Sequence, residues 1–242
     1  MRRINENELE KLSEFMIEQF WGKEEMQQMF KGFNKEKGKS IATNILYMEL
    51  LYFYNKGDIY IFDDDITGSI VGIQAKNLFS IQRILMAFKS NKILKSLSKE
   101  EKEQLQNNIK PIKEVHSSNW YKKYCKNPYY ILQFAIAKDM RGKGIARKML
   151  EELFDYAAKT NSCIVLETFT ESNVPMYEHF GFKVKEFFET GNKELKEYRM
   201  LKKLNNKKTK NIAFGKLTEE DIKNVESDLN QIQKDIDNIF KN

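Results

Sequence analysis

The 242-residue sequence predicts an α+β fold, and three observations lead to this prediction. Apolar residues recur at helical spacing through the first third of the chain. Two segments with alternating apolar residues, 58–62 and 66–75, then indicate paired strands. After residue 128, a buried strand, a glycine-containing turn, an amphipathic helix and a second buried strand follow in order. The apolar content of 41% supplies enough side chains for a packed core, which excludes a globally disordered chain.

The first half of the chain combines helices with one hairpin. Apolar residues at helical spacing predict a helix over 9–20, closed by Gly22, and a second helix over 41–54. The DDDITG segment reads as the hairpin turn between the two strands, and turns favour Asp, so we interpret the three aspartates as turn residues and not as a cation site. A helical run follows at 78–89. A further helix at 99–109 is expected to stop before Pro111.

The second half alternates strands and helices more clearly. Residues 129–137 (YYILQFAIA) form a nearly continuous apolar run, as expected of a strand covered on both faces. An amphipathic helix follows Gly144, and residues 163–169 form another strand. A short helix at 174–180 ends at Gly181, which suits a left-handed helix cap. Two more strands are predicted at 183–188 and 195–201.

The composition changes after residue 203. A basic linker leads into a segment with apolar residues at steps of three and four, which is a heptad pattern of nearly three repeats: Ile222, Val225, Leu229, Ile232, Ile236 and Ile239. We therefore divide the chain into a domain at 1–203 and a linker with an amphipathic C-terminal helix at 204–242. This helix either forms a coiled coil or docks onto its own domain. Its short length favours docking, or an oligomer or partner contact through residues 217–240.

Composition and charge exclude several function classes. The chain has 2 Cys and 2 His, so a disulfide scaffold is excluded and a Cys- or His-rich metal centre lacks ligands. No apolar stretch is long enough to span a bilayer, and no secretory segment follows Met1. The net charge of +6 is mild, and we expect neither a nucleic-acid nor a membrane partner. These features predict a soluble, cytoplasmic protein, and the Lys-, Asn- and Ile-rich composition is typical of an AT-rich bacterial genome.

The turn between the strand at 129–137 and the following helix carries the clearest chemical signal. Gly142 and Gly144 lack Cβ atoms, so backbone N–H groups can approach a ligand closely. The helix that follows presents its unpaired N-terminal donors and its positive dipole end at the same place. Arg141 and Lys143 add positive charge. Together these features predict a site for a pyrophosphate, although the glycines alone also fit an ordinary strand–helix turn.

A second motif lies downstream, and the two together resemble the GCN5-related N-acetyltransferase (GNAT) superfamily. The cofactor signature of that family, Gln/Arg-x-x-Gly-x-Gly/Ala, is met by Arg141, Gly144 and Ala146. Its second signature, an Asn and a Tyr shortly before Gly-Phe, is met by Asn173 and Tyr177. The resemblance covers residues 129–201. The order of motifs looks like the branch that contains puromycin N-acetyltransferase-like proteins.

The resemblance implies a mixed, mostly antiparallel sheet of six or seven strands flanked by helices, with the strands at 129–137 and 163–169 splayed apart. Acetyl-coenzyme A would be the acetyl donor and would lie in the cleft between them, in a cofactor-binding core at 129–201, with no metal required. Its pantetheine arm would pair with the first strand, and its pyrophosphate would contact the glycine loop. The implied cofactor-binding residues are Phe134, Ala135, Ile136, Arg141, Gly142, Lys143, Gly144, Ile145, Ala146 and Asn173.

The resemblance also suggests catalytic residues. Tyr177 matches the family's general acid, because a phenol with a pKa of about 10 is protonated at neutral pH and can donate to a thiolate. The alternative is an ordinary core tyrosine. A backbone N–H on the strand at 129–137, with Ile136 as first choice, would stabilise the oxyanion. Glu167 is our first choice of base, ahead of Glu114, His116 and His179.

The leading functional prediction is an acetyl-coenzyme A-dependent N-acetyltransferase that acts on an amine of a small molecule. Specificity would come from residues 20–55 and 76–128, which resemble the family least. One alternative is acetylation of a protein lysine or N-terminus. Another is a non-catalytic sensor of acyl-coenzyme A whose heptad tail binds a partner.

Overall fold

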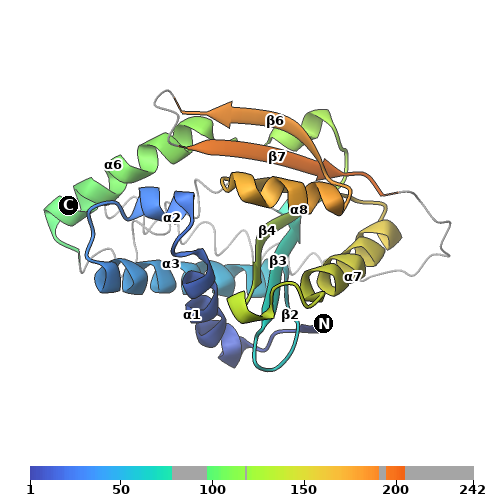
Figure 1. The fold of residues 1–242 in the computed structure, drawn as a ribbon, viewed down its shortest axis with the longest axis horizontal. Helices are drawn as coiled ribbons and strands as arrows, with labels where there is room; N and C mark the ends of the chain where they lie inside the picture. The colour runs from blue at the N-terminus through green and yellow to red at the C-terminus, as the bar shows by residue number, and fades with distance from the viewer. Residues whose placement is uncertain (78–96, 118, 191–194, 205–242) are drawn as a thin grey trace, which may run out of the picture.

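In the computed structural model, the described residues are 1–77, 97–117, 119–190 and 195–204. Within them, seven strands form one sheet in the order β1-β2-β3-β4-β5-β7-β6 (Figure 1). Pairing is antiparallel except between β4 (Pro128–Ile136) and β5 (Cys163–Thr168), which run parallel. The other strands are β1 (Arg2–Arg3), β2 (Asp58–Ile61), β3 (Gly68–Gln74), β6 (Lys183–Glu189) and β7 (Lys196–Lys202). This mixed, mostly antiparallel sheet flanked by helices confirms the predicted fold class.

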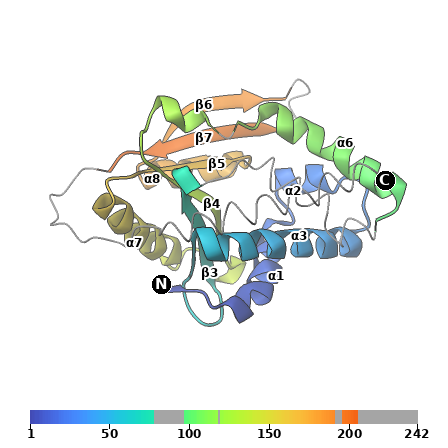
Figure 2. The ribbon, with the colours of Figure 1, turned by 180° about the vertical axis from the view of Figure 1, so that it is seen from behind.

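Helices cover both faces of the sheet. The two ribbon views show α3 (Lys35–Lys56) and α7 (Ile145–Lys159) on opposite sides of the central strands (Figures 1 and 2). Helix α1 (Leu9–Phe20) packs against α3, and α2 (Glu24–Met29) lies beside α6 (Lys99–Val115). The short helix α8 (Val174–His179) follows β5.

Alternating side chains of the sheet divide the core into two clusters. Tyr129 and Ile131 of β4 are buried in the cluster that contains the apolar face of α7. Tyr130, between them, is buried in the cluster that contains α1 and α3. A strand with apolar side chains on both faces needs cover on both faces, which explains the continuous apolar run of β4 in the sequence.

The parallel pair β4 and β5 separates part-way along its length. Partners run from Pro128 opposite Cys163 to Ile131 opposite Leu166, and the pairing ends there. Beyond that point β5 pairs only with β7, whereas β4 continues to Ile136 beside β3. The edge of β4 that would face β5 is therefore open over its last residues, as the predicted splay requires.

Two predicted helix limits were wrong. Helix α6 does not stop before Pro111 but continues through it to Val115. Its start is fixed by a capping box between Ser98 and Glu101, and burial of Ile112 and Val115 beyond the proline stabilises the last turn. Helix α3 begins at Lys35, earlier than predicted, because the Asn34 side chain caps it by accepting hydrogen bonds from two backbone N–H groups.

Some predicted elements lie outside the described residues: the helix at 78–89 and the heptad segment 222–239 within the tail. Strand β1 and helix α2 were not predicted from the sequence. Within the described part of the chain, no helix combines the length and apolarity needed to cross a bilayer.

A single disulfide joins Cys125, just before β4, to Cys163, the first residue of β5. The disulfide links β4 and β5 at the end where they pair, which is opposite the end where they separate. One bond does not make a disulfide scaffold, but disulfides are rare in cytosolic proteins. The cytoplasmic location therefore stays a prediction.

Candidate active site

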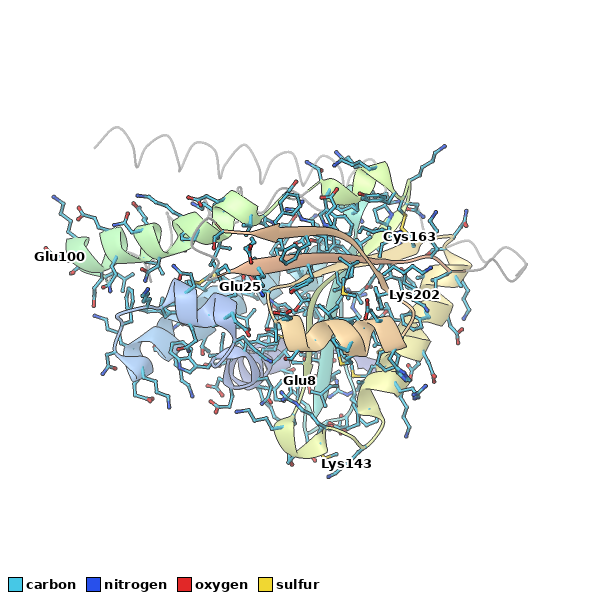
Figure 3. The ribbon with its side chains drawn as sticks, turned by 45° about the horizontal axis from the view of Figure 1, so that its top comes forward. Glu8, Glu25, Glu100, Lys143, Cys163 and Lys202 are labelled. Atoms are coloured by element: carbon cyan, nitrogen blue, oxygen red, sulfur yellow. A yellow bond between two sulfur atoms is a disulfide. The ribbon has the colours of Figure 1, made fainter. Side chains whose placement is uncertain are left out.

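A cavity of about 850 Å³ lies where β4 and β5 separate. Its walls come from α1, α2, α3 and α6, and from β4, the loop before α7, β5 and α8. The sequence-predicted residues that line it are Phe134, Ala135, Ile136, Arg141, Gly142, Gly144, Ile145, Ala146, Glu167, Asn173 and Tyr177. Lys143 does not line the cavity, and Figure 3 shows it at the tip of the loop before α7. The fold thus brings the predicted site residues together from both motifs.

The glycine loop has the geometry expected of an anion site. Gly142 and Gly144 adopt φ angles of +76° and +81°, which side chains rarely allow. Each has open space, with no atom within 4 Å of where a Cβ would lie. Gly144 is the N-cap residue of the 15-residue helix α7, so the unpaired N–H donors of this helix lie at the loop.

The two cations of the loop make contacts within it. The Nε of Arg141 donates to the carbonyl oxygen of Ile136 at 3.3 Å. The Nζ of Lys143 lies 3.3 Å from the sulfur of Met140. Both side chains are exposed, and neither forms an ion pair within the described residues. Their positive charge is therefore free to meet an anion.

Tyr177 lies on α8 with its ring packed against Phe182 at a centroid distance of 5.6 Å. The side chain is buried, and it contributes to the cavity wall. Burial raises the pKa of the Tyr177 phenol above its usual value, so the hydroxyl stays protonated at neutral pH. Asn173, just before α8, is placed by a hydrogen bond from its Nδ2 to the hydroxyl of Thr168 at 3.4 Å.

Glu167 belongs to a cluster of charged groups at the cavity wall. The Nδ1 of His116 lies 3.2 Å from an Oε2 of Glu167 and 3.1 Å from an Oε2 of Glu197. Burial alone would lower the pKa of His116, but its hydrogen bonds to the two carboxylates outweigh burial and raise the pKa to about 10. His116 is thus an imidazolium at neutral pH, and its Nδ1 forms a hydrogen-bonded ion-pair cluster with the Oε2 atoms of Glu167 and Glu197. They also lie within 4.8 Å of one another, close enough for metal ligation.

A buried arginine completes this cluster. Arg199 donates from Nε to Glu197 at 2.5 Å and from Nη1 to Glu186 at 2.7 Å. Its Nη2 donates to the carbonyl oxygen of Val115, which ties the end of α6 to β7. Because His116 follows directly after Val115, this contact places the imidazolium beside β5.

Sequence analysis missed two carboxyl groups of the cavity, Glu25 on α2 and Glu49 on α3. The pKa of Glu25 is raised to about 7: burial raises it, the positive charge of His116 opposes this rise, and Glu197 and Glu167 add to it. Burial also raises the pKa of Glu49 to about 7, with a contribution from Glu25. Figure 3 shows Glu25 on α2, below β7. A glutamate among the apolar residues of the helix at 41–54 was the available signal for Glu49.

Hydrogen bonds fix the helices that carry these two residues. The hydroxyl of Thr170, in the loop after β5, donates to Glu24 at 2.6 Å, which holds the start of α2 against the sheet. On α3, Glu49 accepts a hydrogen bond from the Nε2 of Gln133 of β4 at 3.3 Å. Glu25 and Glu49 form no ion pair within the described residues.

Comparisons with known proteins agree with this geometry. The family model of the acetyltransferase (GNAT) domain matches residues 113–184, which contain β4, the glycine loop, α7, β5 and α8. An uncharacterised N-acetyltransferase of Schizosaccharomyces pombe is 30% identical over 76 residues. Residues 113–184 thus match the acetyltransferase (GNAT) domain, as the two motifs predict.

The alignment with the yeast relative covers 31% of this chain and 31% of the relative. Solved structures of acetyltransferases match more of the chain. A Corynebacterium glutamicum protein described as a histone acetyltransferase and related acetyltransferase has a TM-score of 0.57 and 13% identity, and covers 84% of this chain and 95% of its own. An N-acetyltransferase of Staphylococcus aureus has a TM-score of 0.57 and 17% identity, and covers 83% and 98%. These likenesses show a shared fold.

The predicted resemblance to the GNAT superfamily is confirmed by the domain match at 113–184, and the narrower puromycin-like branch stays a prediction. The match to the GNAT domain model begins near the end of α6, so it includes His116, Glu167 and Tyr177. Glu25 and Glu49 lie outside it, on the N-terminal helices. Of the other candidate bases, His179 lines the cavity with its Nε2 2.9 Å from an Nη2 of Arg147, whereas Glu114 is exposed and does not line it.

Proposed function

We propose that this protein is an N-acetyltransferase that transfers the acetyl group of acetyl-coenzyme A to an amine of a small molecule. One observation carries the proposal: a single cavity of about 850 Å³ joins the glycine loop and Tyr177 to half-buried carboxyl groups. The first region suits an anionic donor, and the second suits a cationic acceptor. A cavity of this volume with a largely apolar wall is typical of a small-molecule site.

The residues of the cavity fit acetyl-coenzyme A. The positive φ angles and open space at Gly142 and Gly144 suit the approach of a pyrophosphate to the backbone. Arg141 and Lys143 supply charge to the same loop. The open edge of β4 at Phe134, Ala135 and Ile136 can pair with the amide groups of the pantetheine arm. Ile145, Ala146 and Asn173 complete the proposed binding surface.

When bound, acetyl-coenzyme A supplies the acetyl group as a thioester: the amine nitrogen bonds to the carbonyl carbon, the carbon–sulfur bond breaks, and the thiolate leaves. Tyr177 is the proposed general acid, since burial keeps its hydroxyl protonated and it lines the cavity. A backbone N–H of β4, with Ile136 as the proposed donor, stabilises negative charge on the carbonyl oxygen.

The proton of the amine needs an acceptor. Glu167 was the first choice, but its carboxylate is already paired with the Nδ1 of His116 at 3.2 Å. The pKa of Glu25, about 7, lies in the range that suits a general base at neutral pH. We therefore assign proton acceptance to Glu25 and a positioning role to Glu167, which with His116 fixes one wall of the cavity.

The test is release of coenzyme A thiol in a screen of small amines. We expect turnover in the wild type and a loss of about 100-fold or more in kcat for Tyr177→Phe, the usual effect of removing a general acid. Tyr156→Phe is the matched control, because Tyr156 lies on the same side of the sheet but does not line the cavity. Binding of acetyl-coenzyme A without turnover of any amine would favour the alternative function, a non-catalytic sensor of acyl-coenzyme A.

Acceptor size is tested in the same assay. Peptides with an internal lysine or a free N-terminus are compared with small amines at equal concentration. We expect faster turnover of the small amines, and faster acetylation of a peptide would contradict the proposed substrate class.

A further inference from the structure

The acceptor side of the cavity holds more negative charge than one amine needs. Three carboxyl groups line it, Glu25, Glu49 and Glu167, and a fourth, Glu197, lies beside His116 and Glu167. His116 and Arg199 neutralise Glu167 and Glu197 through the contacts described above. Glu25 and Glu49 have no cationic partner within the described residues, and they are close enough for the charge of Glu25 to raise the pKa of Glu49. Two half-buried carboxyl groups are thus left for a ligand.

The cations that also line the cavity offset these two groups only in part. His116 favours the ionised form of Glu25, but burial, Glu197 and Glu167 oppose it, and the net effect raises the pKa. At Glu49, burial and the charge of Glu25 oppose ionisation, and the hydrogen bond from Gln133 favours it. A cation inside the cavity would relieve the effects of burial and of neighbouring acids at both groups.

Unpaired polar atoms point to the same kind of ligand. Two acceptor oxygens on cavity-lining side chains are buried and accept no hydrogen bond within the described residues, namely the Oε1 atoms of Gln19 and Gln133. Buried acceptors need donors, and an alkylammonium group supplies three donors and no acceptor.

The rest of the acceptor side is apolar. Side chains of α1, α2, α3 and α6 that line it include Phe20, Met26, Met29, Ile45, Leu46 and Ile112. Such a wall suits a chain of methylene groups and offers no partners for the many hydroxyls of an amino sugar.

We propose that the acceptor is an aliphatic diamine or polyamine, whose second ammonium group is held by Glu49 and Gln133 while the reacting amine lies at Glu25. This inference rests on the proposed function and adds a binding role for Glu49. The reacting amine gives up its proton before attack, whereas the second ammonium keeps its charge throughout. Glu49 is thus a specificity-determining residue.

The binding test uses the protein without acetyl-coenzyme A. Calorimetric titrations at pH 8 compare diaminohexane with hexylamine, which has the same chain and one ammonium fewer. Both amines are cationic at this pH, since alkylammonium pKa values are about 10. We expect diaminohexane to bind at least about tenfold more tightly to the wild type, the effect of one charge-assisted hydrogen bond.

Variants locate the second ammonium. In Glu49→Gln the affinity for diaminohexane should fall to that for hexylamine, while Glu36→Gln, an exposed acid on the same helix, should keep the preference. Glu49→Asp withdraws the carboxylate by one methylene, so the preferred chain in a series from diaminopropane to diaminooctane should lengthen by one carbon. This shift would not arise from a structural role, and it gives a second test if Glu49→Gln does not fold.

The outcomes separate this inference from the proposed function. Equal affinity for the two amines, or a preference that survives in Glu49→Gln, would overturn the diamine inference. If hexylamine and diaminohexane are acetylated equally well, the transferase stands and the inference fails. If diaminohexane binds preferentially but no amine is acetylated, the cation site stands and the transferase fails.

Discussion

Gly144, the N-cap residue of α7, has a φ of +81° and open space where a side chain would project. Replacing it with Asp puts a negative charge where we place the pyrophosphate, whereas Asn has the same shape and no charge. Both residues tolerate the left-handed region better than other side chains do. We expect Gly144→Asp to abolish binding of acetyl-coenzyme A in calorimetry, while Gly144→Asn weakens it less. Both variants should stay folded, and equal affinities in Asp and Asn variants would contradict a phosphate site at this loop.

Glu25 gives a second prediction at this scale, because the folded chain binds its proton more tightly than the unfolded chain. Its pKa is raised from 4.5 to about 7, so the folded state becomes less stable as the pH rises above about 4.5, and the effect is complete above about 7. A neutral Gln avoids this loss. We expect Glu25→Gln to match the wild type at pH 4.5 and to exceed its unfolding free energy at pH 8 by up to about 3 kcal/mol.

Urea unfolding of both proteins across this pH range measures the difference. Glu36→Gln is the control, since Glu36 is exposed and should show no such trend. A Glu25→Gln variant less stable than the wild type at pH 8 would mean that the carboxylate has a stabilising partner.

At the scale of single elements, Pro111 lies within α6 and has no N–H group to donate to the carbonyl four residues earlier. The helix continues because Ile112 and Val115 are buried beyond it. Pro111→Ala restores the missing donor. We expect this change to raise the unfolding free energy by about 1–3 kcal/mol in urea unfolding. Gln106→Ala, at an exposed position of α6, is the control and should have a much smaller effect. A less stable Pro111→Ala variant would show that the proline ring fills space that alanine leaves empty.

The same helix shows why some elements could be predicted and others could not. The apolar run of β4, the amphipathic face of α7 and the glycine loop depend on local sequence, and all three were predicted correctly. The path of α6 through Pro111 depends on burial of its last turn. The position of His116 beside Glu167 depends on the bond from Arg199 to Val115, between residues 84 positions apart. Periodicity contains no information about such contacts.

At the scale of the whole molecule, the disulfide joins residues 38 positions apart and encloses α7. A closed loop of this length restricts the unfolded chain by an amount worth about 4 kcal/mol in the chain-entropy model. We expect reductant to lower the unfolding free energy of the wild type by about 3–4 kcal/mol. The Cys125→Ala, Cys163→Ala double variant should be insensitive to reductant. If reductant leaves wild-type stability unchanged, the two cysteines are not bonded in solution.

The donor and acceptor halves of the cavity could not be predicted equally well from the sequence. The donor half lies within residues 113–184 and carries both family motifs. The acceptor half comes from the N-terminal helices and α6, and sequence analysis named residues 20–55 and 76–128 only as the region of specificity. Glu25 and Glu49 are 24 positions apart, and only the tertiary packing of α2 and α3 places them on one cavity. Their role could not be predicted without that packing.

The unpaired carboxyl groups of the acceptor half also affect what happens after acetyl transfer. An acetylated nitrogen is an amide and carries no positive charge, so the product has one cation fewer than the acceptor. Glu25 and Glu49 together therefore hold the product less tightly than the substrate. Inhibition by the acetylated amine should be weak, and a diamine should leave the protein acetylated at one end only.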